Sequence, residues 1–516
     1  MYDVLIIGCG VTGAAAAFEL AKYQLKVGIL ERENDVALGT TKANSAILHA
    51  GYDPEPGTLM AKLNVRGVEL ARELCGQLDV PYHPCGSLVL AFSEEERPTL
   101  EELYRRGTAN SVPGLELLDG DGARALEPSL SEKVIAALHA PSAAICSPWE
   151  HCLALAETAV KNGVELHLNT AVTGISPIDG WRSGGAGGAN PSPAWAVHTS
   201  QGEFEARFVV NAAGVDAAIV HDMAAPHAFD IRPARGQYYL LDKSEGDRVG
   251  RVIFQCPSKA GKGVLVAPTV HGNLIVGPDS EKVVGNDTAT TGDGLRFVRE
   301  TAQKSVPSVN FRESIRNFAG VRAAADRPDF ILEEGAPGFL DLAGICSPGL
   351  SAAPAIGEYA VELLAKAGLA LEKKDTFLCE RHRTRFKELS PEDRAALVEK
   401  EPAFGRVICR CETITEGEIL EALHGPIPPV SVDGVKRRVN AGMGRCQGGF
   451  CGPRVVDILA RELKKSPGEI VQDQAGSWLL DRETKTAAEP KGGHGGSGGS
   501  GRPALRQPAK GGASHV

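Results

Sequence analysis

The chain has 516 residues, 43% of them hydrophobic and 23% charged, and it carries a net charge of -10 at pH 7. One hydrophobic core seldom serves a chain of this length, so two or three domains are expected. The acidic balance argues against a general nucleic-acid binder. No apolar run reaches the roughly 18 residues that span a bilayer, while peripheral attachment to a membrane stays open.

The chain begins directly with a predicted strand, which leaves no room for a signal peptide. Its 12 cysteines are therefore expected to be reduced thiols and metal ligands rather than disulfides. Together these features predict a cytoplasmic protein, with a peripheral position at the inner face of the membrane left open.

A glycine-rich turn near the N-terminus has the pattern of a dinucleotide-binding site. Residues 4–7 are a short apolar run typical of a buried parallel strand, and residues 14–23 predict a helix. Gly8 permits a tight turn, Gly10 lets the backbone approach a pyrophosphate, and Gly13 lets the helix pack on the strand. The alternative is a glycine-rich turn that binds nothing.

A second predicted strand, residues 26–30, ends at Glu31. In such folds an acidic residue about 20 positions after the glycines binds the ribose hydroxyls of NAD or FAD. Strand, helix, strand and acid stand in the required order, so we expect a Rossmann-type domain that binds a dinucleotide.

Three later segments bear on the choice between NAD and FAD. Residues 39–51 are small and polar and include one histidine, and residues 208–214 run from a strand into a turn of small residues. Residues 344–357 contain a Gly-Leu-Ser turn that opens a helix. The N-terminus of that helix offers backbone N–H groups and a positive dipole end, which would stabilise negative charge on a reduced flavin.

These segments, in this order, resemble the D-amino-acid-oxidase-like (DAO) family of FAD oxidoreductases, and within it the FAD-dependent glycerol-3-phosphate dehydrogenases and oxidases. The resemblance covers roughly residues 1–370. The segments that carry it are residues 43–54, 235–238, 261–264, 318–322 and 347–354. The L-2-hydroxyglutarate dehydrogenases share the pattern of residues 44–52 and 62–67, and remain an alternative.

The resemblance implies an α/β fold, in which a Rossmann-type FAD-binding domain carries a substrate domain built on an antiparallel sheet. The FAD-binding segments are expected at about residues 1–80, 145–225 and 335–370, and the substrate domain at about residues 81–144 and 226–334. The resemblance also implies a set of FAD contacts. They are Gly8, Gly10, Gly13, Glu31, Thr40, Thr41, Asn44, Ser45, Val172, Ala213, Gly214, Gly349, Leu350 and Ser351.

Oxidation of a secondary alcohol requires a hydride acceptor, a base for the hydroxyl proton and a group that binds the anionic end of the substrate. His49 is the predicted base, because the pKa of histidine lies near neutrality and this residue follows the expected FAD-contacting turn. Arg322, which follows a predicted glycine turn, is the predicted anion-binding residue. The plainer alternatives are a packed histidine and a solvated arginine.

The resemblance adds three further candidates. Lys262, between two glycines, is expected to point towards the flavin and the substrate as a catalytic residue. Ser45 and Ser347 are expected to contact the substrate. The alternatives are an exposed hairpin at Lys262 and a helix-capping role for Ser347.

Four cysteines near the C-terminus fall in two close pairs, Cys409 with Cys411 and Cys446 with Cys451. Four thiolates can enclose one metal ion or one iron–sulfur cluster. Structural zinc sites usually pair cysteines two to four residues apart, whereas one and four residues separate the cysteines here. This spacing resembles the 2Fe–2S module of bacterioferritin-associated-ferredoxin-like (BFD-like) domains. Zinc and an empty site are the alternatives.

Residues 405–465 are therefore expected to form a small α-helical BFD-like domain, as at the end of the large subunit of anaerobic glycerol-3-phosphate dehydrogenase. Residues 371–404 are rich in charge and are the expected connector. Residues 487–516 are rich in glycine and are expected to be a disordered tail.

These features predict an FAD-dependent dehydrogenase that oxidises a small anionic hydroxy substrate, glycerol 3-phosphate, to dihydroxyacetone phosphate. Electrons would leave through a 2Fe–2S cluster to a partner subunit or to quinone. The alternatives are an L-2-hydroxyglutarate or other 2-hydroxyacid dehydrogenase, a flavin amine dehydrogenase, and a non-catalytic electron-transfer subunit.

Overall fold

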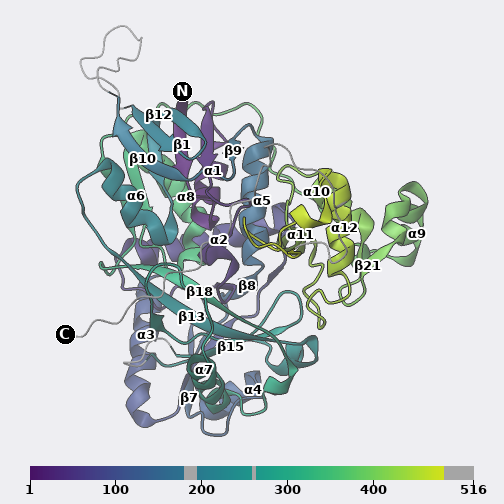
Figure 1. The fold of residues 1–516 in the computed structure, drawn as a ribbon. Helices are drawn as coiled ribbons and strands as arrows, with labels where there is room; N and C mark the ends of the chain where they lie inside the picture. The colour runs from purple at the N-terminus through teal and green to yellow at the C-terminus, as the bar shows by residue number, and fades with distance from the viewer. Residues whose placement is uncertain (179–193, 258–262, 482–516) are drawn as a thin grey trace, which may run out of the picture.

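The computed structural model describes residues 1–178, 194–257 and 263–481 (Figure 1). Lys262 and the predicted tail at residues 487–516 lie outside these ranges. The described chain forms two large sheets with helices packed on them, and the C-terminal helices lie together to one side of both.

The first sheet has the parallel core expected of a dinucleotide-binding domain. Its strand order is β10-β11-β12-β1-β2-β9, with β20 beside β12 and β19 beside β20, and β1 pairs in parallel with both β2 and β12. The strands are β1 (Tyr2–Ile7), β2 (Val27–Leu30), β9 (Glu165–His167), β10 (Val172–Pro177), β11 (Trp195–Thr199), β12 (Gly202–Asn211), β19 (Ile331–Ala336) and β20 (Phe339–Ala343).

Closely packed helices cover this sheet. α1 (Val11–Leu20) packs against α5 (Pro148–Lys161) and α8 (Gly349–Lys366). The alanines of α1 are buried, and their small side chains let the neighbouring helices approach. α2 (Leu59–Gln77) packs on α8, and α6 (Ala217–Ala224) contacts β10 and β20.

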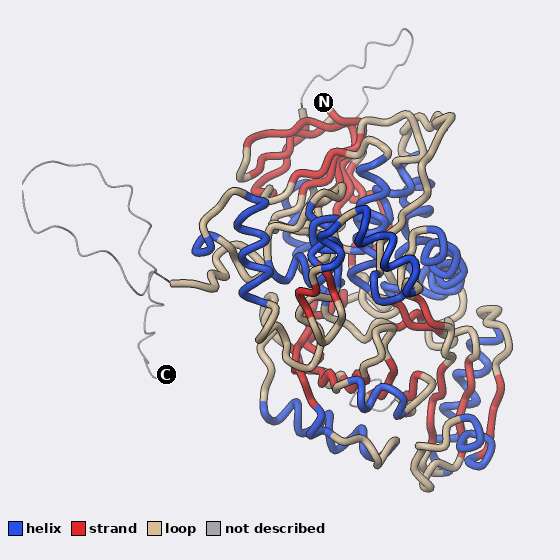
Figure 2. Tube along the Cα trace, turned by 90° about the vertical axis from the view of Figure 1, so that its right-hand side faces the viewer, coloured by secondary structure: helices blue, strands red, loops and turns tan. Residues whose placement is uncertain are grey.

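The second sheet is the expected antiparallel one, and Figure 2 shows its strands below the first sheet. Its order is β17-β13-β16-β15-β14-β5-β7-β6, with β18 paired to β13, and among its described strands only β14 and β5 pair in parallel. The strands are β5 (Ser87–Ala91), β6 (Glu116–Asp119), β7 (Ala136–Ala140), β13 (Ile231–Leu241), β14 (Val252–Gln255), β15 (Leu265–Pro268), β16 (Leu274–Gly277), β17 (Glu281–Lys282) and β18 (Ser314–Ala325).

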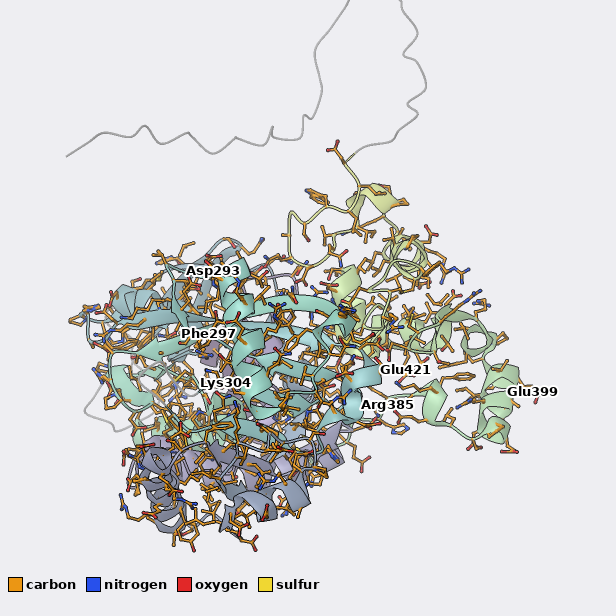
Figure 3. All side chains as sticks on the ribbon, turned by 90° about the horizontal axis from the view of Figure 1, so that it is seen from below. Asp293, Phe297, Lys304, Arg385, Glu399 and Glu421 are labelled. Carbon is orange, nitrogen blue, oxygen red and sulfur yellow. The ribbon has the colours of Figure 1, made fainter. Side chains whose placement is uncertain are left out.

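Three helices contact this second sheet, and a small sheet lies beside it. The helices are α3 (Arg97–Ala109), α4 (Gly120–Leu126) and α7 (Gly292–Ser305), and Figure 3 marks Asp293, Phe297 and Lys304 along α7. The small sheet has the order β3-β8-β4, with β3 (Ile47–Leu48), β8 (Ala144–Cys146) and β4 (Tyr82–His83). β3 places His49 directly at its end.

The C-terminal part has a hydrophobic core of its own, which includes Cys409, Ile419, Val435 and Leu459. Its elements are β21 (Val407–Cys409), β22 (Ile414–Thr415), α10 (Glu416–Leu423), α11 (Val432–Val439) and α12 (Gly452–Leu463). The predicted α/β fold, with its antiparallel second sheet and small helical C-terminal part, is confirmed.

The predicted connector contacts the first region before it reaches this C-terminal part. Three arginines pair with buried or half-buried carboxylates there: Arg381 with Glu157 at 2.6 Å, Arg383 with Glu150 at 2.9 Å, and Arg385 with Asp79. α9 (Pro391–Lys400) then lies at the edge of the molecule, where Figure 3 labels Glu399. The connector is thus tied to the body of the protein at its start.

Candidate active site and metal centre

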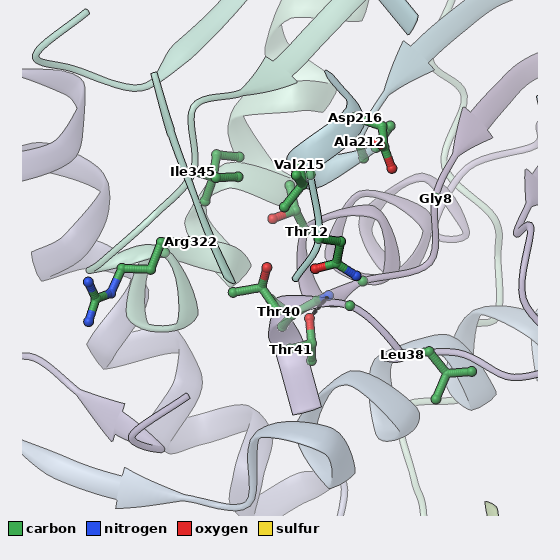
Figure 4. Close-up of a pocket in the computed structure, with 18 of the residues that line it drawn as sticks. Gly8, Thr12, Leu38, Thr40, Thr41, Ala212, Val215, Asp216, Arg322 and Ile345 are labelled. Atoms are coloured by element: carbon green, nitrogen blue, oxygen red, sulfur yellow. Dashed lines mark hydrogen bonds between the residues drawn. The ribbon is translucent and has the colours of Figure 1, made fainter. Parts of the chain in front are cut away.

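A cavity of about 510 Å³ is lined by residues from both large sheets and from α8 (Figure 4). It contains most of the residues that the sequence predicts to contact FAD. These are Gly8, Gly10, Glu31, Thr40, Thr41, Asn44, Ser45, Val172, Ala213, Gly214, Gly349 and Leu350. His49, Arg322 and Ser347 line the same cavity, so the predicted cofactor and substrate groups are brought together.

Two helix N-termini open onto this cavity. α1 begins at Val11 and α8 begins at Gly349, and neither helix has an acidic residue in its first turn. The positive dipole ends of both helices are therefore available to negative charge, while the first N–H of each helix already has a partner, Thr41 Oγ1 for Val11 and the carbonyl of Cys346 for Gly349. This arrangement suits the pyrophosphate and the flavin of a dinucleotide.

Glu31 lies at the end of β2 and is held by backbone donors. Its Oε2 accepts a hydrogen bond from the N–H of Cys9 at 2.8 Å, and its Oε1 accepts one from Glu33 at 3.0 Å. Burial raises the pKa of this carboxyl, while the two N–H donors oppose the increase. The carboxyl is thus fixed beside the glycine turn, where ribose hydroxyls would be bound.

The short helix η1 (Thr40–Lys42) joins the first region to the second sheet. The hydroxyl of Thr40 donates to the carbonyl of Val321 at 2.6 Å, and Thr41 Oγ1 accepts from the N–H of Val11 at 3.0 Å. A Cβ on Gly320 would lie 1.8 Å from the carbonyl oxygen of Ala43, so only glycine permits this approach. In Figure 4 Thr12, Thr40 and Thr41 lie close together, with Leu38 and Arg322 on opposite sides of them.

Two predicted FAD contacts lie behind the cavity rather than on its surface. Gly13 packs α1 on the sheet, since a Cβ there would lie 2.0 Å from the carbonyl oxygen of Gly8. Ser351 is fully buried, and its Oγ accepts the N–H of His49 at 2.7 Å and contacts the carbonyl of Ile47 at 3.5 Å. Ser351 therefore holds β3 and His49 in place, because both of these contacts go to that segment.

His49 is fixed from several directions. Its Nε2 lies 3.3 Å from Ser347 Oγ, and its ring stacks on Phe254 with centroids 5.6 Å apart. Asn64 donates to its backbone carbonyl at 2.9 Å. The imidazole thus has a defined orientation at the cavity wall, with its Nε2 facing Ser347.

Arg322 was expected after a glycine turn, but it lies within β18, which pairs with β13 over almost its whole length. Its Nη1 lies 3.3 Å from Ser280 Oγ, and its Nη2 donates to the carbonyl of Asp279 at 3.2 Å. Within the described ranges, no carboxylate forms an ion pair with this guanidinium. A cation with only neutral partners in a cavity is well suited to bind an anion.

Glycine and tyrosine on β13 shape the space around Arg322. A Cβ on Gly236 would lie 2.8 Å from Arg322 Nη2, so glycine leaves room for the guanidinium. Tyr238 also lines the cavity and stacks on Phe318 at 4.8 Å, and burial raises its pKa. The sequence did not predict Tyr238, although residues 235–238 belong to the segments that carry the resemblance. Lys262 lies outside the described residues.

The four C-terminal cysteines stand as two pairs. Cys411 Sγ lies 3.6 Å from Cys446 Sγ, and the thiol of Cys451 donates to Cys409, which lowers the pKa of Cys409 to about 6. A single zinc ion would hold all four sulfurs about 3.8 Å from one another. Within residues 1–178, 194–257 and 263–481, no group of three or more His, Cys, Asp or Glu side chains is arranged around one ion. Two pairs instead suit two irons with two thiolates each.

Glycines make this arrangement of cysteines possible. A Cβ on Gly444 would lie 2.4 Å from the Cβ of Cys411, and Gly448 adopts a φ of +87° between the second pair of cysteines. Cys409 and Cys451 are buried, whereas Cys411 is exposed. One pair of thiols thus faces the domain interior and the other faces its surface.

The neighbours of the more exposed pair contact the second sheet region. Glu412 Oε2 lies 2.7 Å from Lys243 Nζ, and Gln447 Oε1 accepts from Arg316 at 3.4 Å. Arg316 lies on β18, and Gly320 on the same strand lines the cavity. At roughly 3.3 Å per residue, these two positions are about 13 Å apart along the strand.

Comparison with known proteins assigns both regions. The FAD dependent oxidoreductase (DAO) model matches residues 3–363. The chain belongs to this family. The BFD-like [2Fe-2S] binding domain model matches residues 407–461, which include all four cysteines. FAD and a 2Fe–2S cluster are therefore the cofactors of this DAO-family protein, as the sequence predicts.

Relatives of this DAO-family protein align with most of its length. It is 48% identical to a glycerol 3-phosphate dehydrogenase of Caloramator mitchellensis over 95% of this chain and 100% of the relative. It is 34% identical to a glycerol 3-phosphate oxidase of Mycoplasma genitalium over 72% of this chain and 96% of that protein. The structure of an FAD-bound L-alpha-glycerophosphate oxidase from Mycoplasma pneumoniae superposes with a TM-score of 0.68 at 32% identity. The match covers 74% of this chain and 99% of that structure.

Proposed function

We propose that this protein is an FAD-dependent glycerol-3-phosphate dehydrogenase, which oxidises sn-glycerol 3-phosphate to dihydroxyacetone phosphate and passes the electrons to its 2Fe–2S cluster. The observation that carries the proposal is the full-length match to a glycerol 3-phosphate dehydrogenase, which extends through both cofactor regions. Arg322, a cavity cation with neutral partners, supports a substrate that carries phosphate.

The phosphate of the substrate would bind Arg322. A guanidinium can donate two parallel hydrogen bonds to phosphate, and the existing contacts with Ser280 and Asp279 hold it in place for that purpose. Gly236 keeps the neighbouring space open. Lys262 remains a proposed second cation, because the resemblance directs it towards the substrate.

The reaction needs a base at the substrate's C2 hydroxyl, and His49 is the proposed base. FAD, when bound, supplies the hydride acceptor for the C2 hydrogen. His49 Nε2 would take the hydroxyl proton, and Ser347 Oγ at 3.3 Å would orient the ring or the hydroxyl. The Ser351 hydrogen bond to the His49 N–H fixes the strand that presents the ring.

The N-terminus of α8 supplies the complementary electrostatics. Gly349 and Leu350 line the cavity on the first turn of this 18-residue helix, which has no acidic residue there. The positive end of the helix dipole favours negative charge at this side of the cofactor. We therefore propose them as FAD contacts that assist reduction.

The cluster would pass electrons singly to an acceptor outside this chain. Cys411 is exposed, and Phe450 beside Cys451 is 83% exposed, so the cluster region presents an accessible surface. We propose a protein partner or quinone as the acceptor and a cytoplasmic location with peripheral attachment to the inner face of the membrane. Among the described residues, no helix has the length and apolar character to cross a bilayer.

Anaerobic mixing tests the substrate directly. Bleaching of the flavin absorbance would be followed with sn-glycerol 3-phosphate, L-2-hydroxyglutarate and glycerol at equal concentrations. We expect sn-glycerol 3-phosphate to reduce the flavin fastest and glycerol to be far slower, because it lacks the anion that Arg322 binds. Faster reduction by L-2-hydroxyglutarate would assign the 2-hydroxyacid activity instead. No reduction by any of the three would indicate a non-catalytic electron-transfer subunit.

A further inference from the structure

A turn beyond the iron–sulfur domain returns to the FAD cavity. Gln474 lines the cavity together with Glu31, Arg32 and Thr40, although it lies more than 400 residues further along the chain. Residues 472–477 fall outside both matched ranges, residues 3–363 and residues 407–461. Neither family description therefore accounts for this contact.

The turn is closed by hydrogen bonds of its own. The N–H of Asp473 donates to Ser477 Oγ at 2.9 Å, and the Ser477 hydroxyl donates to the carbonyl of Gln474 at 2.6 Å. The N–H of Gln472 donates to the carbonyl of Ser477 at 2.7 Å. These bonds engage the backbone carbonyl of Gln474 and do not use its side-chain amide, which has one donor group and one acceptor to offer.

Asp473 attaches the turn to the two stretches that form the FAD site. Its Oδ2 lies 2.6 Å from Nζ of Lys42, the last residue of η1, which follows Thr40 and Thr41. Its backbone carbonyl accepts from Asn34 Nδ2 at 2.8 Å, in the loop that follows Glu31. The turn is thus anchored to both sides of the same cofactor site.

The iron–sulfur domain holds the other end of this network. Arg437 of α11 donates to Asp473 at 2.7 Å and to Asp35 at 3.0 Å, and Arg438 donates to Asp35 at 2.8 Å. Asp35 is 1% exposed at its side chain, and the two arginines are 4% and 2% exposed. Burial opposes ionisation of Asp35, yet the two arginines lower its pKa to about 2. Charges buried this deeply are stable only while they remain paired.

We propose that residues 472–477 form a C-terminal part of the FAD-binding site, in which Gln474 hydrogen-bonds FAD and Asp473 holds the turn against Lys42 and Arg437. The ligand class is a dinucleotide, whose phosphates and ribose offer acceptors and donors to an amide. Since the same network docks the iron–sulfur domain, FAD binding and domain docking stabilise each other by the same free energy.

The dissociation rate of FAD from the full-length holoenzyme tests this proposal. It would be followed by the increase in flavin fluorescence after dilution, for Gln474→Ala and Asp473→Ala. We expect FAD release to accelerate about three- to tenfold in Gln474→Ala, the effect of one lost hydrogen bond. Asp473→Ala should accelerate it by about tenfold or more, because Lys42 and Arg437 both lose a partner.

A matched control removes a carboxylate from the same domain without touching the turn. Asp457 lies on the exposed face of α12, and Asp457→Ala should leave the rate of FAD release unchanged. The iron–sulfur absorbance of each variant would show that the domain remains folded. If Asp473→Ala loses that absorbance, Gln474→Ala decides, since the bonds that close the turn do not involve its side chain. FAD release in Gln474→Ala within twofold of the unmutated protein would overturn the direct contact, and the same result in Asp473→Ala would overturn the anchoring.

Discussion

The FAD cavity and the cysteine site are built in opposite ways. The cavity collects residues from Ile7 to Gln474, which come from many separate segments of the chain. The cysteine site uses four side chains within one short stretch, from Cys409 to Cys451, on loops shaped by glycine. A long dinucleotide shares its binding among many positions, whereas a cluster depends on four ligands. Loss of one contact should therefore weaken FAD binding only partly, whereas loss of one cysteine should abolish cluster binding.

The largest effect is expected from loss of one cluster ligand. Cys409→Ser should abolish the electron paramagnetic resonance signal of the reduced 2Fe–2S cluster, because a hydroxyl is a poor substitute for a soft thiolate. Flavin reduction by substrate should continue, since the hydride chemistry lies in the other region. Cys379→Ser, outside the two pairs, is the control and should keep the signal. A persistent cluster in Cys409→Ser would remove this residue from the ligand set.

The next largest effect concerns the proposed base. His49→Ala should slow flavin reduction at saturating sn-glycerol 3-phosphate by roughly 10²–10⁴-fold, the usual contribution of a general base. Rapid mixing under anaerobic conditions would measure it. His424→Ala, an exposed histidine of the iron–sulfur domain, should leave the rate unchanged. An unaltered reduction rate in His49→Ala would exclude the residue from proton transfer.

A smaller effect, on affinity rather than rate, is expected at the anion-binding residue. Arg322→Ala should weaken substrate binding by roughly 2–5 kcal/mol, which raises Kd by about 30-fold or more. The reduction rate at saturation should change much less, so a titration of the rate with substrate separates the two quantities. Arg327→Ala, an exposed arginine paired with Glu333, is the control. Equal Kd values in the two variants would contradict the role of Arg322.

The last effect concerns Glu150 of α5, which pairs with Arg383 of the connector that joins the two regions. Burial alone would raise the pKa of Glu150, but His271, Arg383 and Arg385 lower it from 4.5 to about 2. Its contribution to the free energy of unfolding is therefore present above about pH 4.5 and is lost as the pH falls towards 2. One proton accounts for at most about 1.4 kcal/mol per pH unit.

Acid titration of the free energy of unfolding checks this dependence. Glu150→Gln should lack that part of the slope between pH 4.5 and 2, and it should also be less stable at neutral pH because Arg383 and Arg385 lose an anionic partner. Glu392→Gln, exposed on α9, should titrate like the unmutated protein. Identical acid slopes in Glu150→Gln and the unmutated protein would show that Glu150 does not titrate in this way.

The sequence predicts what local constraints determine. The Gly8 turn and Glu31 are separated by one strand–helix–strand unit, and the cysteines by fixed short spacings, so each can be found without knowing the rest of the fold. Ser351 illustrates the limit of this reasoning. The turn that opens α8 could be predicted, but not that this hydroxyl would face His49 rather than the cavity.

Contacts between distant segments could not be predicted from local patterns. Tyr238 and Gln474 reach the cavity only because β13 pairs with β18 and because α11 docks against Asp35. The spacing of residues along the chain indicates neither this strand pairing nor this docking. The chemistry of its side chain made Arg322 a candidate. Its place within a strand depends on the pairing of β18 with β13, which the short glycine-containing segment does not reveal.

The pairing of β1 with β12 also sets the order in which the chain can mature. β1 ends at Ile7, but its partner on one side ends at Asn211, which a ribosome adding roughly 5–20 residues per second delivers some 10–40 s later. During that interval an almost wholly buried strand lacks its neighbour and needs protection from aggregation. The cavity itself is complete only after Gln474 has been synthesised. The full set of cavity contacts is therefore available to FAD only once the polypeptide is nearly finished.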